Sequence, residues 1–129
     1  MNKVVHFEIP FDNEERAKKF YQDTFGWQIL QVPEMDYSMV TTVETDQQTM
    51  MPKTPGAING GLMKRDQATG MHPVIVIDVQ DLDTHLKRIE NAGGKVVMPK
   101  MDVGDFGVYA RVSDTEGNII GVWQNRIKQ

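Results

Sequence analysis

Residues 74–98 read VIVIDVQDLDTHLKRIENAGGKVVM, and they predict a strand, a helix and a second strand in succession. Val and Ile dominate the first six residues, which is typical of a strand. Asp81 stands at a helix N-cap position, and apolar residues follow at helical spacing: Leu82, Leu86, Ile89 and Ala92. The Gly93-Gly94 pair ends the helix, and residues 95–98 then predict the next strand.

Two more strands are predicted after this segment, at residues 107–112 and 119–123. The turn between them, residues 114–118, has a glycine at a position that suits positive φ. Residues 99–105 begin with proline, and we expect them to form a loop. The second half of the chain is therefore predicted to have the order β-α-β-β-β.

The first half is predicted to repeat this order. Residues 4–9 indicate a strand that Pro10 ends, and their alternation places His6 and Glu8 on one face. The acidic run at residues 12–15 indicates the start of a helix, and Gly26 is placed to end it. The predicted inward stripe of this helix consists of Ala17, Phe20, Tyr21 and Thr24.

Three further strands complete the first half, at residues 27–32, 35–43 and 57–63. The polar residues 44–56, which include two prolines, predict a loop that is long enough to be functional. Residues 66–70 read as a linker between the halves.

These elements predict an α+β domain over residues 1–129, built from a first βαβββ module at 1–66 and a second at 71–129. Each module would expose one apolar sheet face. We expect the two modules to bury these faces against each other or against another chain, in a curled mixed sheet around a cleft.

Composition excludes several classes of protein. The 129 residues contain 14 Lys and Arg against 18 Asp and Glu, so the net charge of −4 does not favour a nucleic-acid partner. No stretch approaches the ~18 apolar residues of a membrane span, and the N-terminus lacks a signal-peptide pattern, so we expect a cytoplasmic protein without a membrane partner. The absence of cysteine excludes disulfides and thiolate chemistry.

Several runs of residues resemble motifs of a known superfamily. The first helix carries Arg16-Ala17-Lys18-Lys19-Phe20-Tyr21 and then Phe25-Gly26-Trp27, and the second half carries Asp114-Thr115-Glu116-Gly117-Asn118-Ile119. In order and spacing these runs resemble the vicinal oxygen chelate superfamily, which includes glyoxalase I, bleomycin-resistance proteins and extradiol dioxygenases. Residues 58–63 and 93–96 resemble its lactoylglutathione lyase-related branch. The resemblance covers essentially the whole chain and implies a glyoxalase-like fold and a homodimer.

The resemblance also implies a divalent metal inside the curled sheet, which would stabilise an oxyanion on the substrate. His6 stands at the first of four implied ligand positions. Val74 and Gly121 stand at the two positions of the second module, and Asn59-Gly60-Gly61 covers the remaining one. His72 misses the Val74 position by two residues. Catalytic metal sites generally need about three protein ligands, so we expect the usual metal site to be largely lost and assign no cofactor. A divalent metal at a non-standard site around His6 stays open.

The residues leave more than one candidate site open. His6 is interpreted as a catalytic acid or base, as a relic of a metal ligand, or as a hydrogen-bonded histidine at a strand end. Glu8 on the same face is a second catalytic candidate, because a neighbouring carboxylate raises the pKa of an imidazole and orients its ring. For ligand binding the candidates are Tyr109, Met63, His72 and Phe106, and core packing or a place in the linker is the alternative for each.

Three functions are compatible with this pattern. The first is a small-molecule lyase, isomerase or oxygenase-type enzyme, which would work either with a non-standard metal site around His6 or without metal, by proton transfer through His6 and Glu8. The second is a protein of the bleomycin-resistance type, which sequesters a ligand without metal and without transforming it. The third is a module whose sheet face is covered by another subunit. Fold alone does not decide between them.

Overall fold

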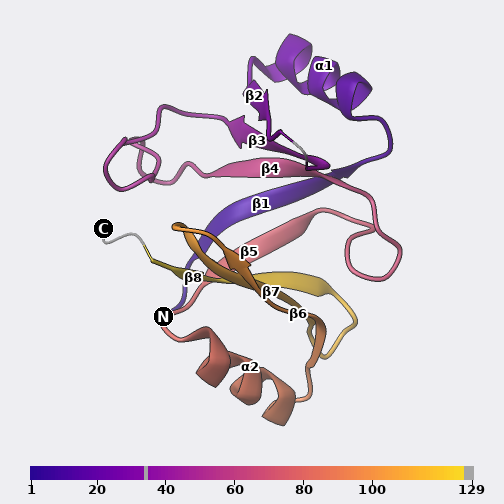
Figure 1. Cartoon of the computed structure of the whole chain (residues 1–129), viewed down its shortest axis with the longest axis vertical. Coiled ribbons are helices and arrows are strands. Elements are labelled where there is room, and N and C mark those ends of the chain that lie inside the picture. Colours follow the sequence, from indigo (N-terminus) through magenta and orange to yellow (C-terminus); the bar gives the residue numbers. More distant parts are fainter. Residues whose placement is uncertain (34, 127–129) are drawn as a thin grey trace. The chain divides into compact units, whose positions relative to one another are not determined.

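Figure 1 shows the computed structural model, which describes residues 1–33 and 35–126. The fold is α+β, as predicted. The elements are β1 (Val4–Phe11), α1 (Glu14–Phe25), β2 (Gln28–Gln31), β3 (Tyr37–Thr41), β4 (Asn59–Lys64), β5 (Val74–Asp78), α2 (Leu82–Asn91), β6 (Lys95–Val103), β7 (Gly107–Ser113) and β8 (Ile119–Asn125). This order is the expected β-α-β-β-β pattern, present twice.

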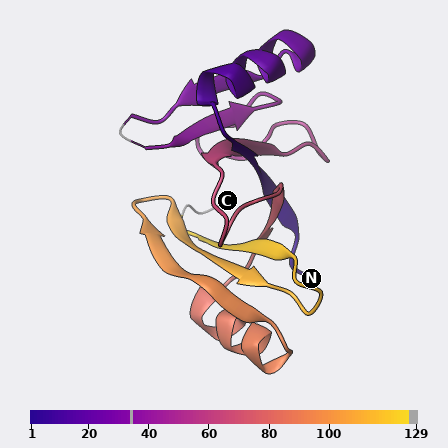
Figure 2. The same ribbon diagram turned by 90° about the vertical axis from the view of Figure 1, so that its right-hand side faces the viewer.

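Parallel and antiparallel strand pairs are mixed, in the order β2-β3-β4-β1 in the first half of the chain and β5-β8-β7-β6 in the second half. The chain divides into two compact units. The first unit is His6–Pro73, and the second unit comprises Met1–Val5 with Val74–Gln129. The first residues of the chain therefore belong with the second β-α-β-β-β segment, where the Asp78 amide donates to the Lys3 carbonyl. In each unit a helix lies along one face of that unit's strands (Figure 2).

In the first unit β1 pairs in parallel with β4, and β3 pairs antiparallel with both β2 and β4. One face of these strands packs against α1. The buried core on that face consists of Phe11, Ile29, Val40 and Leu62, and Phe7, Ile9, Ala17, Tyr21 and Trp27 pack against it. The opposite face carries no helix of this unit, and we call it the helix-free face. His6 and Glu8 share one face, as predicted, and because they alternate with Phe7 and Ile9 this is the helix-free face.

The predicted inward stripe of α1 is only half right. Ala17 and Tyr21 pack on the core, but Phe20 is 55% exposed and Thr24 is exposed. The reason lies in Trp27, whose ring stacks on Tyr21 with centroids 4.9 Å apart. This pair covers the core, so Phe20 lies at the surface, where its ring contacts the rings of Tyr21 and Phe25.

Pro10 does not end the first strand, contrary to the prediction. The strand continues to Phe11, and Pro10 is the register partner of Met63 on β4.

In the second unit β5 pairs in parallel with β8, and β7 lies between β8 and β6 with antiparallel pairing on both sides. Its core on the α2 face comprises Val79, Leu82, Val108, Ala110, Val112 and Val122. The prediction of a loop at residues 99–105 was wrong for most of that segment, because β6 continues to Val103. Its register with β7 shifts between Val96 and Met101, and such bulges on an edge strand accommodate Pro99.

The predicted loop at residues 44–56 is confirmed, since it contains no helix or strand. It is nevertheless ordered by its own contacts. Thr45 and Pro52 form an isolated bridge, and the Asp46 carboxylate accepts from the amides of Gln48 and Thr49. These amide contacts hold the pKa of the Asp46 carboxyl below its usual range. Among the residues that the structure describes, neither helix has the length and apolarity to cross a membrane.

Candidate functional site

The candidate site of the first unit is centred on His6, in the early part of β1. Its side chain is half-buried on the helix-free face. Glu8 follows on the same face and is only 6% exposed. Their register partners on β4 are Asn59 and Gly61. A buried carboxylate therefore lies two residues along β1 from the imidazole, on the same face.

Tyr37 on β3 contacts His6 across this face. A hydrogen bond of 3.2 Å joins the Tyr37 hydroxyl to Nε2 of His6. The residue between them is Gly61, and a Cβ placed there would lie 2.0 Å from the Tyr37 hydroxyl oxygen. The absence of a side chain at this position is what allows the phenol ring to lie across β4 and reach the imidazole.

Burial and charge act on His6 in opposite directions. Burial lowers the pKa of His6, and the nearby Glu8 carboxylate raises it by a smaller amount. Glu8 alone would be expected to raise the pKa, but desolvation of the imidazolium is the larger effect. The imidazole is consequently neutral at pH 7, and a neutral imidazole can accept a proton.

Asn59 fixes the chain that leaves β3 beside this site. Its side-chain oxygen accepts from the amides of Thr42 (2.7 Å) and Val43 (3.2 Å), and its Nδ2 donates to the Thr45 hydroxyl. Because Asn59 is the register partner of His6, the start of the long loop is anchored directly next to the imidazole.

The second unit contains a related arrangement around Tyr109 on β7. Tyr109 is 8% exposed, and the neighbouring Arg111 is 7% exposed. Nε of Arg111 donates to the Tyr109 hydroxyl at 3.0 Å, and its guanidinium carbon lies 5.8 Å from the ring centroid. Gly121 on β8 lies under the ring, because a Cβ at Gly121 would be 2.5 Å from the Tyr109 hydroxyl oxygen.

The other candidates for ligand binding occupy different environments. Met63 is buried on β4, on the same face as Gly61, and is the register partner of Tyr37. His72 is exposed in a bend before β5, and Phe106 is exposed in the turn between β6 and β7. The structure therefore associates Met63 with His6 and Tyr37, whereas Phe106 and His72 lie outside the strands.

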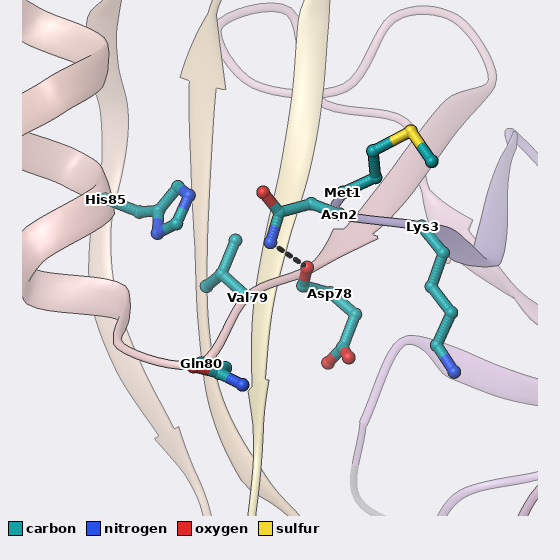
Figure 3. Close-up of a pocket in the computed structure, with 7 residues that line it drawn as sticks. All are labelled: Met1, Asn2, Lys3, Asp78, Val79, Gln80 and His85. Carbon is teal, nitrogen blue, oxygen red and sulfur yellow. Dashed lines mark hydrogen bonds between the residues drawn. The ribbon is translucent and has the colours of Figure 1, made fainter.

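A hollow in the second unit contains none of these candidates. It is lined by residues of the N-terminal segment, the end of β5 and α2, among them Lys3, Asp78 and His85 (Figure 3). The side-chain amide of Asn2 closes part of it by donating to the Asp78 carbonyl at 3.1 Å. Burial raises the pKa of the Asp78 carboxyl, and Lys3 opposes this shift.

The donor set does not fit a divalent metal of the family type. Of the four positions that the resemblance implies, His6 alone offers a ligand side chain. At Gly61 and Gly121 the space of a ligand side chain is occupied by a tyrosine hydroxyl. Within residues 1–33 and 35–126 no group of three or more His, Asp or Glu is arranged to hold a metal ion. We therefore derive no chemical step through a metal.

Comparison with known proteins agrees with this architecture. Residues 3–43 match a family model described as bleomycin resistance protein-like N-terminal. A glyoxylase-like domain-containing protein of Didymella fabae is 32% identical over 120 residues, which cover 90% of this chain and 88% of that protein. CFP32 of Mycobacterium tuberculosis, which carries a provisional glyoxylase name, is also 32% identical, over 91% of this chain. The chain spans 43% of the length of CFP32.

Solved structures show the same fold. A glyoxalase/bleomycin resistance protein/dioxygenase superfamily member from Vibrio splendidus has a TM-score of 0.63 at 14% identity, over 97% of this chain and 99% of that one. Methylmalonyl-CoA epimerase from Mycobacterium tuberculosis has a TM-score of 0.63 at 15% identity, over 95% and 87% of the two chains. The chain belongs to the glyoxalase-like family of the vicinal oxygen chelate superfamily.

Tyr37 is the site residue that sequence reasoning missed. The register of β3 against β4 places its hydroxyl beside His6, and a strand pattern does not reveal register between segments that a long loop separates. The signal that could have found it is the glycine at position 61, because a glycine inside a strand often marks a close approach by another group.

Proposed function

We propose that this chain is an enzyme that moves a proton on a small carbonyl compound, with His6 as the base and without a metal at the family positions. The observation that carries the proposal is the half-buried imidazole on the helix-free face of β1, bonded to Tyr37 and followed by buried Glu8. The names of the relatives, glyoxylase and methylmalonyl-CoA epimerase, indicate carbonyl compounds and acyl thioesters as the class to test.

The electrostatics of the site suit this role. A base must be unprotonated before the reaction and its protonated form must be tolerated afterwards. Burial lowers the pKa of His6 and keeps the imidazole neutral at pH 7. The Glu8 carboxylate favours the imidazolium that forms once His6 accepts a proton.

The test is exchange of substrate hydrogen for solvent deuterium. Purified protein in D₂O with EDTA would be incubated with a panel of 2-oxoaldehyde–thiol adducts and 2-methyl acyl thioesters, and deuterium incorporation would be followed by NMR. We expect exchange at the carbon next to the carbonyl. His6→Gln should slow it by about 100-fold or more, the usual contribution of a general base.

His85→Gln is the matched control, because it makes the same change on α2 in the second unit, and it should exchange at the wild-type rate. Exchange that EDTA abolishes and a divalent ion restores would contradict the metal-free proposal. Exchange by His6→Gln at the wild-type rate would remove His6 from the mechanism.

A ligand-sequestering protein is the second candidate, and the match of residues 3–43 to a bleomycin-resistance-like model favours it. Such a protein would bind a compound saturably and return it unchanged. Calorimetric titration followed by mass spectrometry of the recovered compound separates the two functions. No exchange with any member of the panel, together with saturable binding, would favour sequestration over catalysis.

The proposed assembly is a homodimer. Light scattering of the purified chain across a tenfold concentration range tests it, with a mass of about twice 14.7 kDa as the expected result.

A further inference from the structure

The two units place a tyrosine at the same register position. On β3, Tyr37 pairs with Met63, two residues beyond Gly61. On β7, Tyr109 pairs with Trp123, which is likewise two residues beyond Gly121. In each unit, therefore, a glycine lies two residues before the register partner of the tyrosine, on the neighbouring strand.

In both units the phenol ring leans across that glycine. A Cβ would lie 2.0 Å from the hydroxyl oxygen of Tyr37 at Gly61, and 2.5 Å from that of Tyr109 at Gly121. Both distances are far below van der Waals contact, so any side chain at these glycines would displace the hydroxyl. Both units thus share an arrangement in which a phenol hydroxyl lies over a strand glycine, on the face of the strands opposite the helix.

The partners of the two hydroxyls differ in chemistry. The Tyr109 hydroxyl accepts from Arg111, and a guanidinium is always a donor. The Tyr37 hydroxyl is bonded to Nε2 of His6, and a neutral imidazole nitrogen can accept a proton. The Tyr37 hydroxyl is therefore joined to a group that can accept its proton.

We propose that Tyr37 is a catalytic residue that takes the proton from the substrate while it passes its own proton to Nε2 of His6. This inference rests on the function proposed above. Because the Tyr37 hydroxyl is within hydrogen-bond distance of Nε2, this nitrogen receives the proton through the phenol rather than directly.

The step is balanced within the substrate and these two side chains. The C–H bond next to the substrate carbonyl breaks, and its electron pair remains as an enolate. A new O–H bond forms on Tyr37 as the former one breaks, and an N–H bond forms on His6. Return of the proton along the same path regenerates both side chains, so no oxidant or co-reactant is needed.

The test compares Tyr37→Phe with Tyr21→Phe in the deuterium-exchange assay. Both variants remove one hydroxyl from the first unit, but Tyr21 stacks on Trp27 on the α1 face, away from His6. We expect Tyr37→Phe to lower the exchange rate by about 100-fold and Tyr21→Phe to retain the wild-type rate. Gly61→Ala keeps the hydroxyl but forces it away from His6, and it should reproduce the loss if Tyr37→Phe folds poorly.

A spectroscopic measurement separates proton transfer from a structural role. The ¹⁵N signals of His6 would be titrated by NMR in wild type and Tyr37→Phe. The Glu8 carboxylate, which raises the pKa of His6, is present in both proteins and so does not affect the comparison. If Tyr37 donates to neutral Nε2, its loss removes a bond that favours the neutral form, and the pKa of His6 should rise.

The outcomes distinguish the two proposals. Loss of exchange in both His6→Gln and Tyr37→Phe, with a raised pKa of His6 in the latter, supports the relay. Loss in His6→Gln alone overturns the relay and leaves His6 as the direct base. A lowered or unchanged pKa of His6 in Tyr37→Phe also overturns it. Wild-type exchange in His6→Gln, or none by the wild-type protein, overturns the proposed function and the relay with it.

Discussion

His6 and Glu8 show how one strand face can set the charge state of a site. The imidazole loses hydration on burial, and this favours its neutral form more than Glu8 favours its charged form. Such a residue makes the folded protein sensitive to acid. The unfolded chain takes up a proton near pH 6.5, the ordinary pKa of histidine, whereas the folded chain does so only at lower pH.

This difference predicts a pH dependence of stability. As the pH falls below about 6.5, protonation favours the unfolded chain, and the contribution of His6 to the free energy of unfolding falls until the lowered pKa is passed. His6→Gln removes this titration, so the variant should lose less stability than wild type between pH 7 and pH 5. Urea unfolding of both proteins at several pH values measures this loss in the free energy of unfolding. The exposed His72→Gln should follow the wild type, and parallel curves for wild type and His6→Gln would contradict the prediction.

The helix termini are determined by local side chains. Asn13 caps α1 by accepting from the amide of Arg16 at 2.9 Å, and Asp81 caps α2 by accepting from the amide of Thr84 at 3.2 Å. Gly26 ends α1 in the left-handed conformation, with φ of 70°. Asp81 and Gly26 were predicted at these positions, and the start of α1 was predicted within residues 12–15, because capping depends on neighbours within a few residues.

The caps can be compared directly. Asn13→Ala and Asp81→Ala should each lower the free energy of unfolding by about 1 kcal/mol, the typical value of a lost N-cap. Asn13→Ser and Asp81→Ser keep a side-chain acceptor and should lose only part of this. Chemical denaturation of the four variants is the measurement. Equal losses for the Ala and Ser variants would show that the caps act through something other than the hydrogen bond.

The loop after β3 depends on one side chain rather than on local propensity. Asn59→Ala removes the acceptor of the Thr42 and Val43 amides, and we expect faster hydrogen exchange and proteolysis within residues 42–58. Asn59→Asp keeps that acceptor and loses the donor to Thr45, so it should protect the loop better than Asn59→Ala. Equal protection in the two variants would show that the acceptor oxygen does not hold the loop.

On the scale of the whole molecule, the described residues form a hydrophobic core in each unit. Leu62 in the first core and Leu82 in the second are both 0% exposed. Leu62→Ala and Leu82→Ala should each cost about 2–5 kcal/mol. Since each core belongs to its own unit, hydrogen exchange should rise mostly within the unit that carries the substitution. A uniform rise over both units would show that the chain opens only as a whole.

The order of elements, the helix caps and the alternation of β1 follow from the sequence alone. They depend on contacts within a few residues. The periodicity of apolar residues and capping residues such as Asn13, Gly26 and Asp81 indicate these contacts directly. Two strand limits were wrong because neither Pro10 nor Pro99 ends its strand. Pro99 is tolerated because β6 is an edge strand, and a sequence does not show which strands are edges.

The site depended on the tertiary structure. His6 and Glu8 were found from their shared face, but Tyr37 reaches His6 only through the register of β3 on β4 and the missing side chain at Gly61. The neutral state of His6 likewise follows from burial, which outweighs the neighbouring carboxylate. Register and desolvation arise from residues far apart in the chain, so neither can be read from local pattern.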